Sequence, residues 1–410
     1  MKKLLLLLFF YSSISYAQID FTRIYHPIIN EAELAIVDTN YHEALAFYNE
    51  AFANVEKPFA KDYYNAAVCA TIVGKMPVMF DFLEKIVAKG YQIENFRHDF
   101  FFKNVADTCK QWANFEKQAK LIKPQINTEL RDSLRNIYRL ITKPPVTPIT
   151  AELRSYIKAH EKEQKWMPVD SLVLMNNMPK NLQNQVDSLR KLNSMKEADI
   201  IRDKLLIVLK MLDIHGFLDE NLLGLNQYFQ TNMQGPPFRN NTVTANYSSS
   251  YLYENTLVGD ILMFSSFQRQ VDKIDISPII KQAIREGKAH PVIIKALVGY
   301  STDEPCTMGK VLVMQLRLED NINCPNKDWD IKKEKYYWKK EKSATLSEIE
   351  INERRQNLGL EKLEDAYRKA FFKSRPTPFL IYGGSYQAEL AYIPNCELID
   401  KMIKGAIVLR

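Results

Sequence analysis

The 410-residue chain lacks the residue spacings that mark the common metal and nucleotide sites. No two of its five cysteines have the close spacing of a zinc site. A glycine-rich phosphate loop, a dinucleotide-binding glycine pattern and a His-Glu-x-x-His pair are all missing. The six histidines are scattered, and no acidic or cysteine cluster joins them. We therefore predict no cofactor and no metal, and we assign no catalytic residue from motifs.

Long apolar runs are also missing, apart from one at the start of the chain. Crossing a bilayer takes about 20 apolar residues, and no stretch after the first residues reaches that length. Residues 1–17 combine two lysines, a short apolar core and small residues at Ser15 and Ala17. This pattern predicts a secretory signal that is cleaved between Ala17 and Gln18. We expect an exported protein, periplasmic or secreted, without a transmembrane segment.

A large excess of one charge sign is missing as well. The formal net charge is +6, and removal of Lys2 and Lys3 with the signal would lower it to +4. This balance gives no broad attraction for nucleic acid, so we expect no nucleic-acid partner. The densest charged run begins at Lys332 and ends at Lys342, with six lysines, two glutamates and three aromatic residues. A solvated arm whose lysine stems cover the rings explains it, and the functional alternative is binding of an anionic glycan or lipid head group.

Cysteine usage is compatible with an oxidising compartment. An exported protein can form disulfides, and the odd number of cysteines leaves at least one thiol unpaired. Cys306 and Cys324 flank a predicted hairpin arm and are our candidate disulfide. Cys69 and Cys109 lie on predicted helices with apolar neighbours, where we expect buried free thiols.

The stretch from residue 40 to residue 90 has a helical period. Apolar residues at 44, 45, 48, 51 and 52 share one helix face, and those at 79, 83 and 86 share another. The steps from Ala44 to Met79 and from Ala51 to Ile86 are both 35 residues. Helix-turn-helix arrays repeat at about 34 residues. The pattern therefore predicts stacked helix pairs, completed by helices at 22–37 and 104–122.

These residues resemble a tetratricopeptide repeat. Residues 40–52 are similar to the second helix of one repeat, and residues 63–67 with Gly74 are similar to the first helix and turn of the next. Pro77 and the large Met79 depart from the family pattern. The resemblance implies a groove that holds a peptide or protein partner. In that groove Tyr63, Tyr64 and Asn65 are the candidate partner-binding residues.

The rest of the chain predicts a second region that is also mainly helical. Three prolines within 143–148 cannot continue a helix and predict an extended linker. Beyond it we expect, among others, separate helices at 181–193 and 198–214, then a half-buried strand at about 311–319. Near the C-terminus, 379–382 and 386–392 predict a β-hairpin with Gly383 and Gly384 in its turn. The predicted parts are the signal at 1–17, a tetratricopeptide-like domain at 18–140, the linker at 141–150, a helical domain at 151–375 and a hairpin-containing segment at 376–410. The expected class is mainly α with a small antiparallel β element near the C-terminus.

The second region also has a resemblance of its own. The motifs that carry it are Glu163-Gln164, His215-Gly216-Phe217, the stretch 259–300, Glu353-Arg354-Arg355 and Leu358-Gly359-Leu360. Over about 155–372 they resemble an uncharacterised domain of exported bacterial proteins, which often follows tetratricopeptide-like helices. Members of that family tend to have a histidine in a middle helix and an Asp-Arg pair after the next. Here those positions hold Ser265-Ser266 and fall near Gly299-Tyr300, so any chemistry of the family is largely lost.

The polar residues of this region each have a plain structural explanation. His215 ends a predicted helix, where a cation is favoured by about 0.3–1 kcal/mol. Arg354 and Arg355 could hold a carboxylate or phosphate, but pairing with nearby acidic residues inside the domain explains them as well. We expect that Glu163, His215, Asp303 and Arg354 do not converge on one cleft.

The sequence thus favours an exported, non-enzymatic interaction protein that binds an envelope protein or peptide. The alternatives are an exported hydrolase with a site in 151–375, and an inert envelope component.

Overall fold

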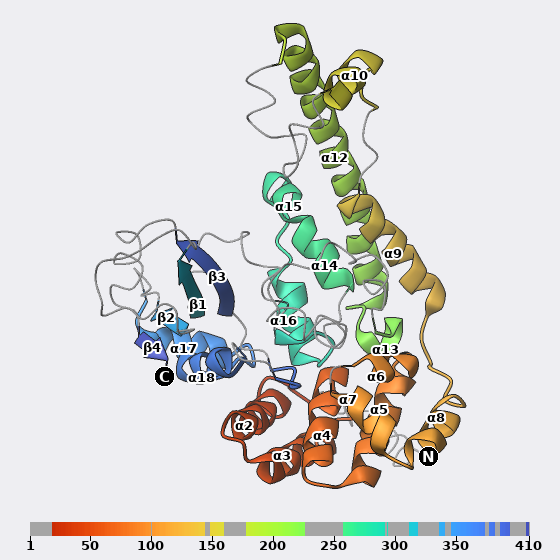
Figure 1. Ribbon diagram of the computed structural model, residues 1–410, viewed down its shortest axis with the longest axis vertical. Coiled ribbons are helices and arrows are strands. Elements are labelled where there is room, and N and C mark those ends of the chain that lie inside the picture. The colour runs from red at the N-terminus through yellow and green to blue at the C-terminus, as the bar shows by residue number, and fades with distance from the viewer. Residues whose placement is uncertain are drawn as a thin grey trace, which may run out of the picture.

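The computed structural model describes a mainly helical protein (Figure 1). The described residues are 19–99, 101–143, 148–159, 178–225, 257–291, 293, 311–318, 336–340, 346–373, 377–381, 386–393 and 407–409. Within the strands only the backbone is described. The predicted mainly α class is confirmed. The predicted signal and its cleavage site after Ala17 lie outside the described residues.

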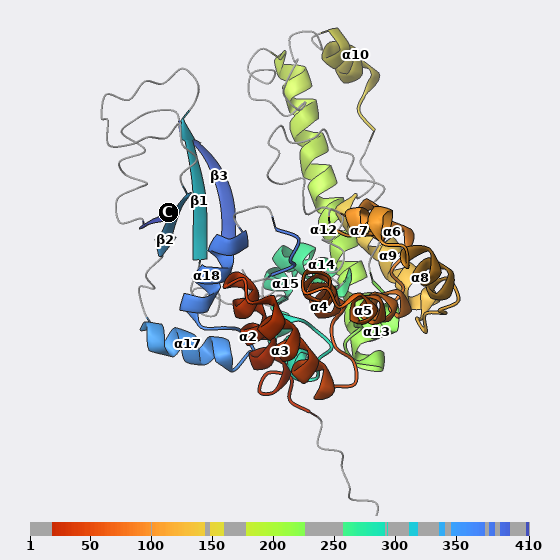
Figure 2. The same cartoon turned by 60° about the horizontal axis from the view of Figure 1, so that its bottom comes forward.

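Four helices of equal length form the first part of the chain. They are α2 (Tyr25–Val37), α3 (Tyr41–Ala53), α4 (Ala60–Ile72) and α5 (Met76–Ala88), each with 13 residues. The step from residue 25 to residue 60 and the step from residue 41 to residue 76 are both 35 residues. Each helix packs on the next one along the chain, as two views show (Figures 1 and 2). We call these four helices the array.

The turns inside the two helix pairs have the same backbone geometry. Thr39 has φ 60° in the turn between α2 and α3, and Gly74 has φ 79° at the equivalent place between α4 and α5. After each turn an amide bonds to the carbonyl five residues earlier, at 2.8 Å in the first turn and 2.7 Å in the second. A left-handed residue closing a helix in this way is a common C-terminal motif, for which glycine is favoured. The 35-residue period is therefore present in the turns as well as in the helices.

Small side chains on α4 allow its neighbours to approach closely. Ala66, Ala67 and Ala70 are fully buried, and aromatic and branched residues fill the space around them. The short helices α6 (Glu94–His98), α7 (Phe102–Thr108) and α8 (Trp112–Ala119) follow the array, and α8 packs on α5. Their buried aromatic residues complete the same core, which we call the first core.

A second core lies beside the first. It is formed by α9 (Thr128–Thr142), α12 (Lys180–His215), α13 (Glu220–Leu223), α14 (Leu257–Phe264), and α16 (Ser277–Arg285), with α15 (Ser266–Asp272) packed on α12 and α14. Although α9 precedes the predicted linker, its buried side chains belong to this second core. The N-terminal half of α12 stands away from both cores and packs on α10 (Ala151–Ala159), as Figure 1 shows.

The prediction of two helices at 181–193 and 198–214 is wrong. α12 runs without interruption for 36 residues. Asn193 and Ser194 are weak helix formers, but no proline or glycine between Lys180 and His215 removes a backbone hydrogen bond or frees the chain. The helix therefore continues until Gly216, whose φ of 70° ends it.

Glu220 joins the second core to the array. Its carboxylate accepts a hydrogen bond from the amide of Ala60, at the first residue of α4, at 2.8 Å. It also lies 2.8 Å from the Lys89 ammonium, which follows α5. The side chain of Glu220 is fully buried, so these contacts fix where α13 meets the array.

The last part of the chain returns to the array. α17 (Glu348–Gln356) is followed by α18 (Leu363–Lys373), which packs on α2. Backbone pairing is described for β1 (Val311–Leu318), β2 (Tyr336–Lys340), β3 (Tyr386–Ile393) and β4 (Ile407–Leu409), in the order β3-β1-β2-β4. The β1–β2 and β2–β4 pairs are antiparallel, whereas β1 and β3 are parallel.

The predicted hairpin of 379–382 with 386–392 is not formed. Residues 379–381 are not in a strand, and β3 pairs with β1 instead. Phe379, Leu380 and Ile381 are buried in the first core and not in the predicted hairpin. Burial of three large apolar side chains against the array outweighs the local turn signal of Gly383 and Gly384, two residues that lie outside the described part.

Candidate functional site

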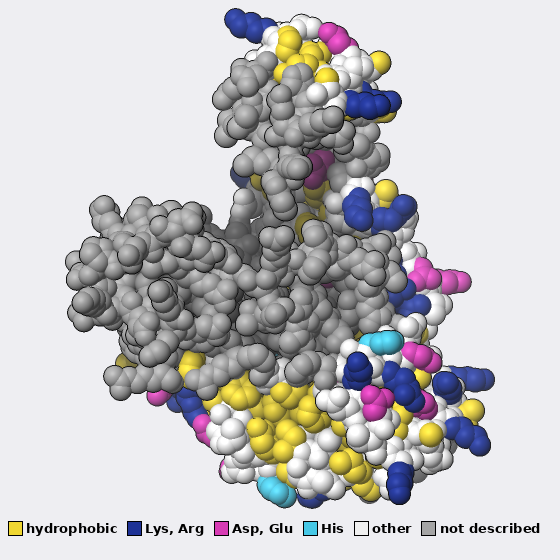
Figure 3. Space-filling view, in the orientation of Figure 1, with side chains coloured by type: hydrophobic (Ala, Val, Ile, Leu, Met, Phe, Trp, Pro, Cys, Tyr) yellow, Lys and Arg dark blue, Asp and Glu magenta, His cyan; other side chains and the backbone are white. Residues whose placement is uncertain are grey.

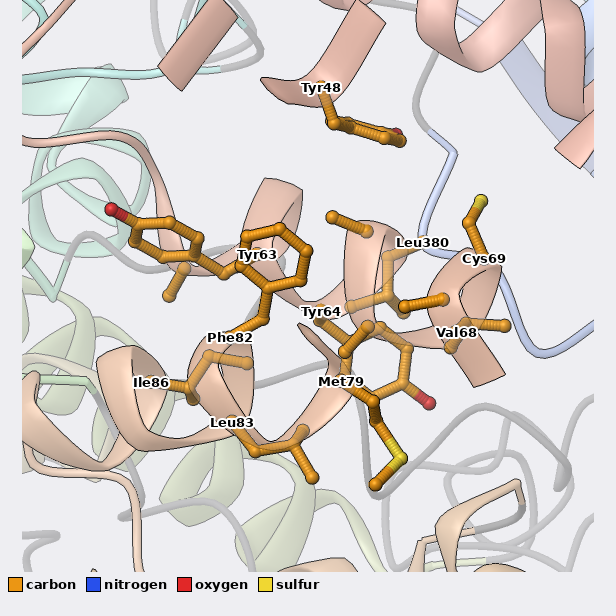
Figure 4. Packing of buried hydrophobic residues seen from close by; sticks show 14 of the residues in the cluster. Tyr48, Tyr63, Tyr64, Val68, Cys69, Met79, Phe82, Leu83, Ile86 and Leu380 are labelled. Atoms are coloured by element: carbon orange, nitrogen blue, oxygen red, sulfur yellow. The ribbon is translucent and has the colours of Figure 1, made fainter. Parts of the chain in front are cut away.

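The three residues expected to bind a partner lie on α4 and are buried. Tyr63 is 8% exposed, Tyr64 1% and Asn65 0%. Figure 4 shows the two tyrosines within the first core, between side chains of α3 and α5. These side chains therefore face the interior of the folded chain, and their role in binding a partner stays a prediction.

The two tyrosines have structural partners. The ring of Tyr63 lies 4.7 Å from that of Phe52 and 6.0 Å from that of Phe82, measured between centroids. The hydroxyl of Tyr64 donates to the carboxylate of Asp99 at 3.0 Å, and Asp99 also accepts from the backbone that begins α7. Burial raises the pKa of both tyrosines, with nearby carboxylates adding to the effect. Both hydroxyls are therefore neutral at ordinary pH.

Asn65 holds a distant segment of the same chain. Its side-chain amide donates to the carbonyl oxygen of Leu380 at 3.1 Å, and its side-chain oxygen accepts from the Leu380 amide at 2.7 Å. Both backbone groups of one residue are thus satisfied by a single carboxamide. We call residues 377–381 the resident segment. Its backbone runs past α4 in an irregular conformation, with no strand or helix assigned.

The side chains of the resident segment fill the first core. Phe379 and Leu380 are 2% exposed and Ile381 is 0% exposed. The Phe379 ring stacks on that of Tyr41, from the start of α3, at 5.6 Å. Figure 4 shows Leu380 among the side chains of α4 in the same cluster. The array therefore already holds a short apolar segment, through the hydrogen bonds of Asn65 to its backbone and through a set of apolar contacts.

Next to this segment, a buried network of charges links α2, α4 and α18. The Lys61 ammonium lies 2.5 Å from Glu33 and 2.7 Å from Asp62, and the Lys369 ammonium lies 2.7 Å from Glu33. The Tyr25 hydroxyl donates to Asp62 at 2.7 Å. All four charged side chains are at most 4% exposed, and two ammonium groups balance two carboxylates.

Burial and the neighbouring charges shift the pKa values of this network in different directions. Burial acts to raise the pKa of Glu33, but the ammonium groups of Lys369 and Lys61 outweigh it and lower that pKa. Burial acts to lower the pKa of Lys61, but Asp62 and Glu33 outweigh it and raise that pKa. Burial raises the pKa of the Asp62 carboxyl, although the ammonium of Lys61 acts against it. The contacts of the network fasten α18 to the array.

Of the four residues expected not to converge, the structure describes His215 and Arg354. His215 is exposed at the end of α12 and Arg354 is exposed on α17. Glu163 and Asp303 lie outside the described residues, so the expected lack of convergence stays a prediction. Arg355 is fully buried and pairs with Glu361 at 3.1 Å, which the sequence reading did not name among its partners.

The cysteine predictions are answered in part. Cys69 and Cys109 are free, and Cys69 is buried as expected, whereas Cys109 is half-buried. Burial raises the pKa of the Cys69 thiol, which makes it a poor nucleophile. Cys306 and Cys324 lie outside the described residues. So does the charged run from Lys332 to Lys342, except for the backbone of β2.

Comparisons with known proteins give no relative from which a function could be inferred. No family model, no curated protein and no solved structure matches the chain. Among the described residues, no helix is long and apolar enough to span a bilayer. The same part of the chain has no group of three or more His, Cys, Asp or Glu side chains that could hold a metal ion.

The sequence reading missed the partners of its own candidate residues. Leu380 is 315 residues away from Asn65, and Lys369 is 336 residues away from Glu33. A polar residue among apolar neighbours on a helix was the available signal, and it marks Asn65 and Glu33 without indicating their partners. Nothing in the local sequence identifies what such a residue contacts.

Proposed function

We propose that the protein is an exported, non-enzymatic interaction protein of the cell envelope whose array binds a short apolar segment of a protein partner. The observation that carries this proposal is the pair of hydrogen bonds between Asn65 and the backbone of Leu380. This pair of bonds supports a binding role, because a site that binds a peptide through its backbone is expected to make such a contact.

The chemistry of this contact indicates which ligands fit. A carboxamide that bonds both backbone groups of one residue recognises chain conformation and not side-chain identity. Selectivity then comes from the apolar seats, by which we mean the places in the first core that hold Phe379, Leu380 and Ile381. Other modes of peptide recognition also combine backbone hydrogen bonds with side-chain pockets. The resident segment presents Phe379, Leu380 and Ile381 to these seats. We infer that the partner offers a similar run of large apolar residues.

Two features of the predicted architecture belong to this proposal. The first is that the helix pairs are tetratricopeptide-like repeats, for which the 35-residue period and the matched turns are the support. The second is that a small C-terminal β element accompanies them.

Figure 3 shows hydrophobic side chains gathered on the outer face of the array, which is the kind of surface that a protein partner covers.

A peptide supplied from outside tests the proposal directly. In the full chain, residues 377–381 are replaced by a Gly-Ser sequence of equal length, which removes the resident side chains. A synthetic peptide with the sequence of residues 375–383 is then titrated by calorimetry. We expect saturable binding, together with a rise in the melting temperature of the variant.

Two controls make the result specific. The same peptide should bind at least about tenfold more weakly when the variant also carries Asn65→Ala, because about 1.4 kcal/mol corresponds to a factor of ten. A peptide in which the residues equivalent to Phe379 and Ile381 are serine should also bind weakly. Absence of binding to a folded variant, or equal binding with Asn65→Ala, would refute the array as a segment-binding site. Turnover of any envelope substrate by the purified protein would refute the non-enzymatic assignment.

A further inference from the structure

One face of α12 is exposed over most of the length of the helix. The helix packs on the second core through Leu205, Val208 and Leu212, which are buried. On the opposite side, the positions reached from residue 192 by alternating steps of four and three, up to residue 213, are all exposed. We call the residues at these positions the outer strip. Steps of four and three stay on one helix face, so the strip is a continuous surface about 32 Å long.

Large apolar side chains are exposed on this strip and beside it. Leu192 and Leu206 belong to the strip, and Met195, Ile207 and Ile214 flank it; all five are between 41% and 63% exposed. Apolar residues that are exposed singly are normal on protein surfaces. Several on one face of a helix, opposite the face that packs on the core, form a second apolar surface. A partner helix can cover such a surface.

The order of charges along the strip indicates which partner fits. From its N-terminal end the strip contains Lys196, Asp199, Asp203, Lys210 and Asp213. When a second copy lies antiparallel to the first with position 196 facing position 213, Lys196 faces Asp213 and Asp199 faces Lys210. Two-fold symmetry repeats both contacts in the dimer. The strip is therefore complementary in charge to its own reversed copy.

Other alignments of two strips bring like charges together. Sliding one strip by seven residues keeps the same positions of the repeat in contact, but it places Asp199 opposite Asp203 in one direction and Asp203 opposite Asp213 in the other. In a parallel pair each residue lies beside its own copy, so lysines meet lysines and aspartates meet aspartates. Because like charges in contact oppose association, the charges select one register. In that register Met195 faces Ile214, which adds an apolar contact at each end of the strip.

A contact of Asp199 within α12 is compatible with this pairing. Its carboxylate lies 3.6 Å from the Arg202 guanidinium, and both side chains are exposed. An exposed pair of this kind contributes little to stability, and a carboxylate can accept from more than one donor. A lysine of a second copy can therefore share the carboxylate with Arg202.

We propose that the protein forms a dimer with a second copy of itself through the outer strips of α12, paired antiparallel in the register that brings Asp199 to Lys210. Exposed apolar residues supply the attraction, and the order of charges sets direction and register. The proposal is independent of the function proposed for the array, because the strip and the contact of Asn65 with Leu380 share no residue.

Sedimentation equilibrium of the full chain tests the dimer. We expect the average mass to rise from that of a monomer toward that of a dimer between about 1 µM and about 100 µM protein. A chain that stays monomeric over this range would overturn the proposal. Lys210→Glu puts like charges at two contacts of the dimer and should weaken self-association at least about tenfold. Unchanged self-association of this variant would place the contact elsewhere and refute the proposal.

A mixture of two charge variants tests the register. Asp199→Lys should also weaken self-association at least about tenfold, because the new lysine faces Lys210. When Asp199→Lys is mixed with Lys210→Glu, the new lysine faces the new glutamate, and the native Asp199 faces the native Lys210. We expect the equimolar mixture to associate about as strongly as the unaltered chain. Both substitutions are at exposed positions, and circular dichroism checks that each variant is folded. A mixture of folded variants that does not associate would refute the register.

The apolar part of the contact has a matched control. Ile214→Gln alters an exposed residue beside the strip and should weaken self-association, whereas Ile349→Gln alters an exposed residue of α17 and should leave it unchanged. Equal self-association of the two variants would mean that the apolar face of α12 is not in the contact, and it would overturn the proposal.

Discussion

The contact between Asn65 and Leu380 makes a prediction that can be followed at a single backbone amide. Asn65→Ala removes both hydrogen bonds and leaves the N–H and C=O of Leu380 inside the first core. A net hydrogen bond contributes about 0.5–1.5 kcal/mol, and a buried group left unpaired costs more. Two bonds to one buried residue therefore stabilise the resident segment by about 2–3 kcal/mol.

This loss should appear as faster exchange of the Leu380 amide hydrogen. The segment belongs to no helix or strand, so we expect that it can open without unfolding the helices of the array. With 1.4 kcal/mol for each factor of ten, exchange of that amide should accelerate by about 30- to 150-fold in Asn65→Ala. Asn54→Ala is the matched control, because the exposed Asn54 side chain bonds only to the Glu50 carbonyl at the end of α3.

The measurement is native-state hydrogen exchange, read for the resident segment and for α4 in the same experiment. Selective acceleration in residues 377–381 agrees with the reasoning. Equal acceleration throughout α4 would mean that the segment and the array open together, and an unchanged rate at Leu380 would mean that Asn65 does not hold it. Either result would refute the idea of a separable resident segment.

Three further predictions concern stability, and each is measured by chemical denaturation. Thr39→Gly should stabilise the array by roughly 1 kcal/mol, because Thr39 has φ 60°. Gly74→Ala in the equivalent turn should destabilise it by a similar amount. A change in the free energy of unfolding with the same sign in both variants would contradict the matched turns. Lys369→Met leaves Glu33 short of a buried partner and should lower the free energy of unfolding by about 3–5 kcal/mol. Arg368→Met breaks an exposed pair and should lower it by less than about 1 kcal/mol. Similar losses in the two variants would argue against the network. His26 has a folded-state pKa of about 3 and an unfolded value near 6.5, so the stability that its neutral form gives is present above pH 6.5 and is lost as the pH falls toward 3. His26→Gln should therefore reduce the slope of the free energy of unfolding against pH in this window by up to about 1.4 kcal/mol per unit. An unchanged slope would refute the low folded-state pKa of His26.

The parts of the fold that the sequence predicted are those set by nearby residues. The four array helices follow from apolar residues at helical spacing, and their 35-residue period is visible because Ala44 and Met79 occupy equivalent places. Gly74 marks one turn, but Thr39 gives no comparable signal because threonine seldom adopts positive φ. The continuity of α12 was less predictable, because the weak helix formers Asn193 and Ser194 suggested a break that the helix does not have.

The candidate site was not predictable in the same way, since its contacts join distant parts of the chain. Residues 379–381 are apolar and precede two glycines, which is the local pattern of a strand and a tight turn. Their true environment is set by Asn65 and by the seats of the first core, more than 300 residues earlier. Likewise, the close contact between His26 and Gly359 exists only because the loop that joins α17 to α18 returns to α2. Local periodicity contains no information on such encounters.

The burial of the candidate trio changes what a partner must do to bind. An open groove would let a peptide bind directly, but here the resident segment already occupies Asn65 and its apolar seats. A partner segment must therefore exchange with it, and its net affinity is reduced by the free energy that holds the resident segment in place. If that free energy is about 2–3 kcal/mol or more, the wild-type chain should bind the 375–383 peptide at least about 30-fold more weakly than the Gly-Ser variant does. Equal affinity of the two proteins would mean that the peptide binds elsewhere, so this comparison distinguishes exchange at Asn65 from binding at the outer face.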